Sequence, residues 1–201
     1  MDKIDDIVSI LKLENKKYIV PIVTIVSMTK GPFAVLISCL LSLRTKDKVT
    51  GEASNRLFKL ADNPESMLGL STKSIEKTIY PVGFYKTKAK RIKEICKTLL
   101  DDYEGVVPDE IDELLKLKGV GRKTANLTVT LGYGKLGICV DTHVHRISNR
   151  LGLVTTKTPD QTEFVLRKTL PQKHWLIYND LLVTYGQNLC VPVSPWCSKC
   201  R

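Results

Sequence analysis

Two side chains that could do chemistry stand eighteen residues apart, the primary amine of Lys123 and the carboxylate of Asp141. The lysine follows a Gly-Val-Gly turn, and the aspartate lies between an apolar run and a more polar stretch. A neutral amine attacks an electrophilic carbon and forms a Schiff base, whereas a carboxylate stabilises the positive charge left by a departing group. Residues of these types could carry out a substitution through a covalent intermediate, or they could simply stand at the starts of two helices.

The expected position of Lys123 favours its neutral form. We expect this residue in the first turn of a helix, where the positive end of the helix dipole and the neighbouring Arg122 both disfavour a protonated amine. A free lysine has a pKa of about 10.4, so a nucleophilic lysine needs an influence of this kind.

Asp141 is also well placed to cap a helix, because the segment THVHRI that follows it begins a helical pattern. On spacing alone, capping is the preferred interpretation. The two roles are compatible, since a carboxylate that caps a helix is held rigidly and can still present an oxygen atom to a ligand.

The turn before Lys123 reads LKGVG and joins two predicted helices. Two glycines let the backbone turn sharply and leave the next amide groups unobstructed. Such amides suit a phosphate oxygen, and a contact of this kind positions a nucleic acid without reading its bases. A glycine turn between packed helices needs no ligand, so the turn alone is weak evidence. The residues expected to contact the phosphate backbone are Gly119, Val120, Gly121, Arg122 and Thr124.

The segments around this turn are predicted to be helical. The clearest pattern runs from Lys88 to Tyr103, where apolar residues recur at helical spacing and the other face is basic. We interpret the basic face, formed by Lys90, Arg91, Lys93 and Lys97, as solvated rather than phosphate-binding. The sequence has no convincing alternating strand pattern and predicts an all-α protein. Other helices are expected at 1–13, 32–43, 46–59, 72–80, 109–115, 123–132, 142–152, 159–170 and 175–189.

The 201 residues carry a formal net charge of +10, which attracts polyanions. Nucleic acid is the leading partner, and an anionic membrane or acidic protein is the runner-up. The N-terminus lacks the long apolar stretch of a signal peptide, and the longest apolar run, residues 33–41, is shorter than the roughly 20 residues that span a bilayer. We therefore expect no membrane partner, and a location in the cytoplasm at the nucleoid of a prokaryote, or in the nucleus of a eukaryote.

Together these motifs resemble the helix-hairpin-helix DNA glycosylases, specifically their endonuclease III branch. The resemblance rests on the hairpin at 119–125, on VDTH at 140–143 and on a terminal cysteine cluster, and it extends over nearly the whole chain. It implies two helical lobes with a cleft between them. One would be a six-helix lobe at 25–135 that contains the helix-hairpin-helix, and the other a four-helix iron-sulfur-type lobe at 1–24 and 136–201.

The resemblance also implies roles for the two side chains. Lys123 would attack C1′ of a damaged nucleotide, and Asp141, facing it across the cleft, would support positive charge on the sugar and handle protons. β-Elimination of the 3′ phosphate would follow, with no catalytic divalent metal. The implied protein is a monomeric base-excision repair glycosylase with lyase activity at apurinic or apyrimidinic (AP) sites, acting on oxidised pyrimidines in duplex DNA.

Two alternatives stand beside this prediction. One is a monofunctional mismatch glycosylase, although the adenine-removing and thymine-mismatch branches of the family typically lack a lysine at the position of Lys123. The other is a non-catalytic DNA-binding module that uses only the hairpin and the basic surface.

Chemistry at C1′ requires the nucleotide to leave the stack and a side chain to fill the space. By resemblance, Phe84 in the turn VGFYK would insert between bases, although a loop phenylalanine also commonly packs on its own domain. Arg44 stands where the family commonly has a glutamine that enters the gap. Arginine donates hydrogen bonds but accepts none, which leaves the opposite-base preference open. Lys118 replaces a common proline and adds charge close to phosphate.

Cys190, Cys197 and Cys200 have the spacing C-x6-C-x2-C, which in the resembled family begins the C-x6-C-x2-C-x5-C ligand set of a [4Fe-4S] cluster. The fourth cysteine is missing from this sequence, and the favoured explanation is that the sequence stops inside the ligand loop. A cluster with three protein thiolates, no cluster, and a zinc site completed by His174 are the alternatives. The cluster would be structural. The remaining cysteines, Cys39, Cys96 and Cys139, lie in apolar stretches and are expected to be buried.

Overall fold

The computed structural model describes residues 3–28 and 30–200. Over these ranges the chain is helical and has no β-strand, so the predicted all-α class is confirmed. The chain forms two compact units, Ile22–Lys135, here the hairpin unit, and Met1–Pro21 with Leu136–Arg201, here the terminal unit. Within the described ranges, no helix is long and apolar enough to cross a membrane.

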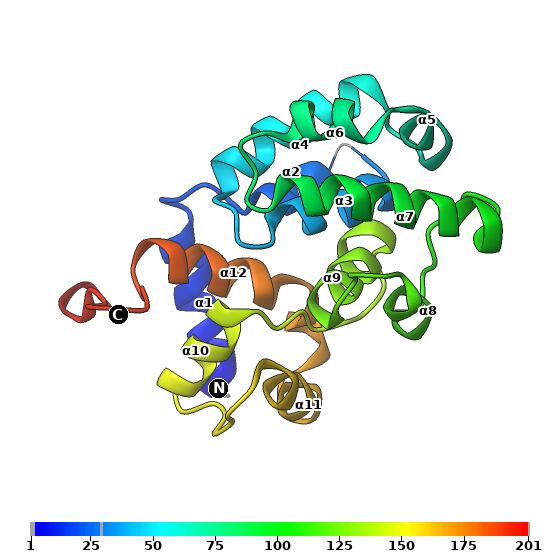
Figure 1. The fold of residues 1–201 in the computed structure, drawn as a ribbon. Coiled ribbons are helices and arrows are strands. Elements are labelled where there is room, and N and C mark those ends of the chain that lie inside the picture. Colours follow the sequence, from blue (N-terminus) through cyan, green and yellow to red (C-terminus); the bar gives the residue numbers. More distant parts are fainter. Residues whose placement is uncertain (1–2, 29, 201) are drawn as a thin grey trace. The chain divides into compact units, whose positions relative to one another are not determined.

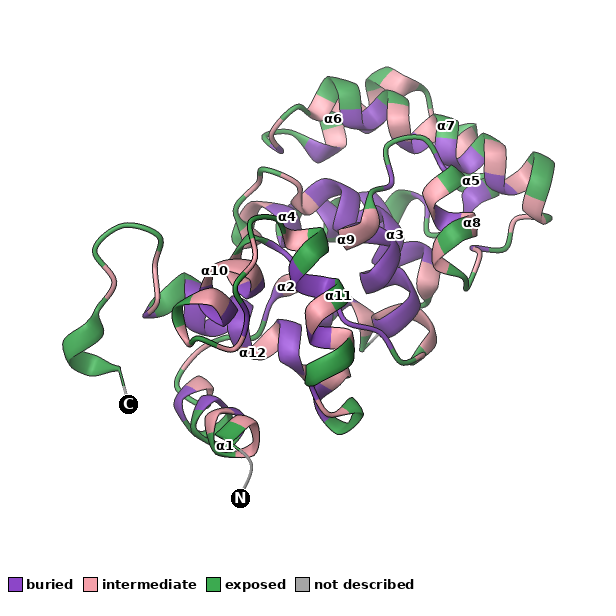
Figure 2. Cartoon of the chain, turned by 90° about the horizontal axis from the view of Figure 1, so that it is seen from below, coloured by how far each residue is buried: buried purple, intermediate pink, exposed green. Residues whose placement is uncertain are grey.

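The hairpin unit is built from helices that pack around α3 (Pro32–Ser42), which contacts α2, α4, α7, α9 and η1 (Figure 1). The sequence of α3, PFAVLISCLLS, has no charged residue, and the helix is buried from Phe33 to Leu41 (Figure 2). The other elements of the hairpin unit are α2 (Ile22–Ser27), α4 (Asp47–Leu60), α5 (Pro64–Gly69), α6 (Thr72–Ile79), α7 (Tyr85–Tyr103), α8 (Ile111–Lys116), α9 (Arg122–Leu127) and the π-helix η1 (Thr128–Gly132).

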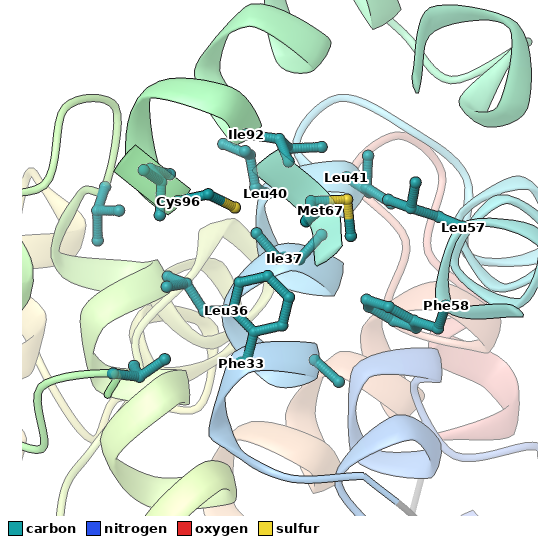
Figure 3. Packing of buried hydrophobic residues seen from close by; sticks show 14 of the residues in the cluster. Phe33, Leu36, Ile37, Leu40, Leu41, Leu57, Phe58, Met67, Ile92 and Cys96 are labelled. Atoms are coloured by element: carbon teal, nitrogen blue, oxygen red, sulfur yellow. The ribbon is translucent and has the colours of Figure 1, made fainter. Parts of the chain in front are cut away.

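One apolar core holds these helices together (Figure 3). Side chains of α3 meet side chains of α4, α5 and α7 in this core, and Ala125 of α9 is fully buried in it as well. The burial of apolar area in this core is what fixes the helices that carry candidate functional residues. Members of the core in Figure 3 are Phe33, Leu36, Ile37, Leu40, Leu41, Leu57, Phe58, Met67, Ile92 and Cys96.

The terminal unit joins the first helix to the last third of the chain. Its α10 packs against α11 and α12, and α12 packs against α1. Gly186 lies where α12 meets α10. The two helices approach so closely there that a Cβ atom on Gly186 would lie 2.5 Å from His143 Nδ1. The elements are α1 (Lys3–Asn15), α10 (Thr142–Arg150), α11 (Pro159–Thr169), the 3₁₀ turn η2 (Gln172–His174), α12 (Trp175–Asn188) and the 3₁₀ turn η3 (Cys197–Lys199).

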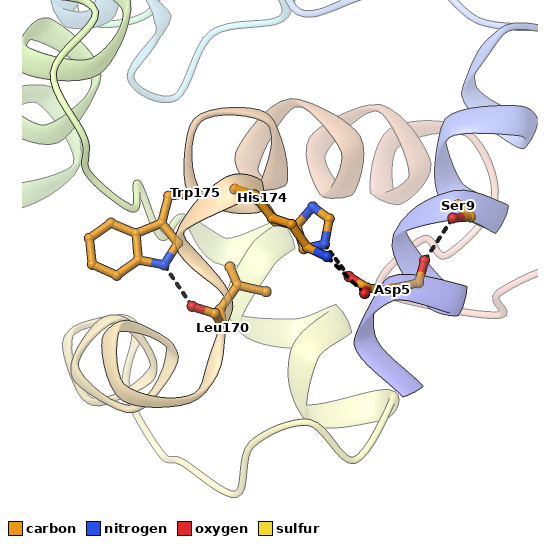
Figure 4. Close-up of polar contacts among 6 residues, drawn as sticks. Asp5, Ser9, Leu170, His174 and Trp175 are labelled. Carbon is orange, nitrogen blue, oxygen red and sulfur yellow. Dashed lines mark hydrogen bonds and ion pairs between the residues drawn. The ribbon is translucent and has the colours of Figure 1, made fainter. Parts of the chain in front are cut away.

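Polar contacts tie α1 to the rest of the terminal unit (Figure 4). The carboxylate of Asp5 lies 2.6 Å from His174 Nε2 and 2.8 Å from Lys173 Nζ. Farther along α1, Asn15 Nδ2 donates a hydrogen bond of 2.8 Å to the carbonyl of Leu181. These contacts join segments about 170 residues apart and fix the position of α1 on η2 and α12.

The described helices match most of the predicted ones and differ in a few places. Sequence periodicity does not predict α2 or α5, because each has six residues and periodicity needs a longer stretch to show. Helix α7 begins at Tyr85, three residues before the expected start. Helix α8 begins at Ile111, with Glu110 as its N-cap, and not at Asp109. The start of the first predicted helix, residues 1 and 2, lies outside the described residues.

The interpretation of the basic face of α7 as solvated is wrong for Lys93. Its ammonium group donates hydrogen bonds to the carbonyls of Leu68 and Leu70, the last of these at 2.6 Å. Carbonyl groups at the end of a helix have no partner within the helix, and a cation there also complements the helix dipole. Lys93 therefore joins α7 to the end of α5.

Candidate functional site

The predicted turn joins α8 and α9 in the hairpin unit. Gly119 has φ +86°, a conformation that a residue with a Cβ atom rarely adopts, and the N–H of Val120 donates to the carbonyl of Leu117 at 3.0 Å. Val120 is buried in the core and anchors the turn. Gly121 is the N-cap residue of α9 and, as a glycine, has no side chain that could bond to the first amide groups of the helix. A Cβ atom added to it would meet no atom within 4 Å. The backbone at Gly121 is therefore open to a ligand.

Helix α7 supports the turn from behind. A Cβ atom on Gly119 would lie 2.7 Å from Arg91 Nε, and Arg91 itself is held by an ion pair of 2.6 Å with Glu94. The other oxygen of Glu94 lies 3.6 Å from Lys118 Nζ. A side chain at position 119 would therefore displace Arg91, in addition to the strain that the left-handed backbone imposes.

Lys123 is the second residue of α9, as predicted, and is half-buried. Its positive charge acts on the thiol of Cys39 in α3, because it partly offsets the burial that raises the pKa of Cys39 to about 12. The amine of Lys123 therefore lies near enough to α3 to act on a side chain of that helix. Thr124, which was predicted to contact the phosphate backbone, is more buried than Lys123 and only 2% exposed. Its carbonyl accepts a hydrogen bond from Thr128 Oγ1 at 2.9 Å.

Asp141 is the N-cap of α10 in the terminal unit. Its Oδ1 atom accepts hydrogen bonds from the backbone N–H groups of His143 and Val144, at 2.8 and 2.9 Å. The predicted capping role is confirmed. Capping through one oxygen fixes the orientation of the whole carboxylate, and Asp141 as a residue is 7% exposed.

Arg44 and Phe84 lie on two loops of the hairpin unit, between α3 and α4 and between α6 and α7. The Arg44 guanidinium lies 5.7 Å from the centre of the Phe84 ring, within the range of a cation–π contact. Both side chains are exposed, so Phe84 does not pack into its own domain. Both residues also have left-handed backbones, with φ +53° at Arg44 and +57° at Phe84.

Sequence reasoning assigned no role to Thr45 and Lys88, which the structure brings to these same loops. Lys88 is 6% exposed, and the sequence pattern of α7 already indicates that this lysine is buried. Positions 88, 92, 95 and 99 share one face of α7, and the last three are buried apolar residues. A lysine in line with such a face is expected to be buried.

The three terminal cysteines differ in their contacts. Arg150 Nη1 lies 3.4 Å from Cys190 Sγ, Tyr185 Oη lies 3.2 Å from Cys200 Sγ, and Cys197 is exposed. In the part of the chain that the structure describes, no three histidine, cysteine or acidic side chains gather as a metal site. The thiol donors suit an iron-sulfur cluster in kind, and their assignment as ligands stays a prediction. Cys39, Cys96 and Cys139 are buried, as predicted.

The sequence pattern of the HhH-GPD superfamily of base excision DNA repair proteins matches residues 37–172, which include the hairpin, Lys123 and Asp141. The chain belongs to this family. Endonuclease III of Thermotoga maritima is 47% identical over 169 residues, which cover 84% of this chain and 79% of that protein. The chloroplastic endonuclease III homolog 1 of Arabidopsis thaliana is 42% identical over 86% of this chain, which spans only 48% of that longer protein.

A solved structure points to the same branch of the HhH-GPD superfamily. A trapped endonuclease III–DNA covalent intermediate superposes with a TM-score of 0.81 and 37% identity, over 85% of this chain and 81% of that one. The predicted resemblance to endonuclease III is confirmed. Family membership and these matches support a base-excision DNA glycosylase. AP lyase activity is typical of the endonuclease III family, whose members generally carry a [4Fe-4S] cluster.

Proposed function

We propose that this protein removes oxidised pyrimidines from duplex DNA and then cleaves the strand at the abasic site, with Lys123 as the nucleophile. The observation that carries the proposal is the placement of a lysine in the first turn of α9, directly after an open glycine hairpin. The likeness to a trapped covalent endonuclease III–DNA intermediate supports it, because a covalent intermediate requires a nucleophile on the protein.

The chemistry balances with the groups that the chain supplies. The neutral amine of Lys123 attacks C1′ of the damaged nucleotide, the bond from C1′ to the base breaks, and the base leaves with the electron pair and takes up a proton. The sugar ring opens to a protonated imine. Loss of a proton from C2′ then expels the 3′ phosphate by β-elimination, and water hydrolyses the imine to restore the amine.

Asp141 has an electrostatic role in this proposal. Departure of the base leaves positive charge on the sugar, and a fixed carboxylate stabilises that charge more than a mobile one does. The cap on α10 supplies this rigidity. The proposal requires Lys123, in the hairpin unit, and Asp141, in the terminal unit, to act on one nucleotide.

DNA binding in the proposal begins with the phosphate backbone. The hairpin presents the exposed backbone at Gly121, where an added Cβ atom would meet nothing within 4 Å, and the net charge of +10 adds a long-range attraction. Binding of this kind releases counterions, so affinity falls steeply with salt. Phe84 and Arg44 then fill the space left by the extruded nucleotide. We further propose a monomer that acts on chromosomal DNA, in the nucleoid or the nucleus.

We also propose that Cys190, Cys197 and Cys200 bind a [4Fe-4S] cluster with a structural role. Thiolates at this spacing are the donors such a cluster takes, and no step of the reaction transfers electrons. A visible absorption spectrum of the purified full-length protein tests the proposal. The brown iron-sulfur band is expected, and its absence from anaerobically purified protein would contradict the assignment.

An oligonucleotide cleavage assay separates the three candidate functions. A duplex with one oxidised pyrimidine is incubated with the protein and analysed with and without alkali. The bifunctional enzyme cleaves the strand without alkali, a monofunctional glycosylase yields cleavage only after alkali, and a binding module yields none. Lys59→Ala, which removes an exposed lysine of α4, is the control and is expected to match the wild type.

A further inference from the structure

The two loops that carry Arg44 and Phe84 meet at their backbones. Gly83 approaches the Arg44 carbonyl so closely that a Cβ atom would lie 2.6 Å from the Arg44 oxygen. The backbone N–H of Gly83 also donates a hydrogen bond of 3.2 Å to Thr45 Oγ1. The loops are therefore in direct contact, although about forty residues separate them in the chain.

The hydroxyl group of Thr45 joins the loops through all of its hydrogen-bonding positions. It accepts from the N–H of Gly83 and from Lys88 Nζ, each at 3.2 Å, and donates to the carbonyl of Leu43 at 3.3 Å. A hydroxyl has one proton and two lone pairs, so these three bonds use its full capacity. A side chain of the same shape without the hydroxyl would leave the N–H of Gly83 without this partner.

The ammonium group of Lys88 holds the same loop from inside the unit. It donates to the carbonyls of Leu41 and Leu43, at 2.7 and 2.6 Å, in addition to Thr45 Oγ1. Three N–H donors thus meet three acceptors, which offsets the burial of the charge. The carbonyl of Leu41 lies near the end of α3, so Lys88 ties the loop with Arg44 to the central helix and to α7.

We propose that Thr45 and Lys88 are positioning residues that lock the loop of Arg44 to the loop of Phe84, so that both side chains enter the duplex as one preassembled unit. This inference rests on the proposed function, since it concerns how that enzyme opens DNA. The left-handed backbones at Arg44 and Phe84 support it, because such conformations persist in non-glycine residues only where neighbouring contacts hold them.

Fluorescence of 2-aminopurine tests the proposal apart from catalysis. The base is placed opposite a tetrahydrofuran abasic analogue, which cannot form a Schiff base, and insertion of side chains unstacks it and raises its fluorescence. Affinity for the same duplex is measured by anisotropy. Thr45→Val and Lys88→Met are expected to lose most of the fluorescence rise at saturating protein, while affinity for the duplex changes far less.

Two further variants separate positioning from general stability. Thr45→Ser keeps the hydroxyl and is expected to restore the fluorescence rise. Lys93→Met removes a comparable lysine-to-carbonyl contact from the same helix, away from these loops, and is expected to keep the wild-type rise even if its melting temperature falls. Thr45→Val replaces the threonine with a side chain of the same shape, so it tests the hydroxyl even if Lys88→Met does not fold.

The outcomes are distinct. A wild-type fluorescence rise in Thr45→Val would overturn the inference, as would equal loss in Thr45→Ser or the absence of a rise in the wild type. The proposed function fails separately, through the lack of strand cleavage at an oxidised pyrimidine. A protein that cleaves DNA but shows no dependence on Thr45 would keep its proposed function and lose only this inference.

Discussion

Asp141 Oδ1 accepts a hydrogen bond of 2.9 Å from the backbone N–H of Val144, so the carboxylate proposed to stabilise the sugar also begins a helix. The two roles are separable by substitution. Asparagine caps helices about as well as aspartate but carries no charge. Alanine has no capping group and carries no charge.

Substitution of Asp141 is therefore expected to affect stability and activity differently. Asp141→Ala should lower the free energy of unfolding by about 0.5–2 kcal/mol, as loss of an N-cap does elsewhere. Asp141→Asn should unfold near the wild-type denaturant midpoint and yet lose glycosylase activity. Urea unfolding and single-turnover base release measure the two effects, and full activity in Asp141→Asn would rule out a role for the charge.

Gly119→Ala is expected to weaken DNA binding through distortion of the hairpin. The left-handed backbone costs a non-glycine residue about 1–2 kcal/mol, and the new Cβ atom also meets the side chain of Arg91. Gly134 is a matched control, because it has φ +66° and open space where its Cβ atom would lie. Both variants should lose stability, but only Gly119→Ala should lose affinity in a fluorescence anisotropy titration. Equal affinities would place the DNA contact elsewhere.

The buried thiols are expected to resist alkylation. Burial raises the pKa of both Cys39 and Cys96 to about 12, so almost no thiolate, the reactive form, is present at pH 8 in the folded protein. Unfolding returns the pKa to its usual range near 8.5 and exposes both groups. Iodoacetamide labelling followed by peptide mass spectrometry should modify Cys197 readily in cluster-free folded protein and Cys39 only in urea. Rapid labelling of Cys39 without denaturant would show that the core around α3 opens.

The contact between α1 and η2 is expected to weaken in acid. Hydrogen bonds from Lys173, and then from His174, hold the pKa of Asp5 below its usual value. A carboxyl group with a lowered pKa in the folded state stabilises the fold above its unfolded pKa and loses this effect as pH falls through the folded pKa. The protection of α1 amides against hydrogen exchange, corrected for the intrinsic pH dependence of exchange, should therefore fall below about pH 4.

Asp5→Ala should show the same loss of protection at neutral pH, whereas Asp6→Ala, which removes an exposed neighbour, should not. Unchanged exchange in Asp5→Ala would mean that apolar packing alone holds α1 in place.

The sequence predicted those features whose physical cause is local. The turn at Gly119, the cap at Asp141 and the place of Lys123 in α9 depend on residues within one helical turn, and each lies where it was expected. The cysteines expected in the core were predicted equally well, because each lies in an apolar stretch, and an apolar stretch is what packs into a core.

Features that depend on distant segments were not predicted. The roles of Lys88 and Lys93 require carbonyl groups more than twenty residues away, which no periodic pattern locates. The stacking of Arg44 on Phe84 needs two loops to meet, and the burial of Thr124 depends on the packing of α9. The boundaries of α2 and α5 are set by packing as well, since helices of six residues are not stable alone.

Borohydride trapping tests the central claim that Lys123 bonds covalently to deoxyribose. The protein is mixed with a duplex that carries an oxidised pyrimidine, the imine is reduced, and the cross-linked peptide is identified by mass spectrometry. The wild type and Lys59→Ala are expected to form a cross-link at Lys123, and Lys123→Ala is expected to form none. Equal trapping by Lys123→Ala, or a wild type that does not cross-link, would contradict the account.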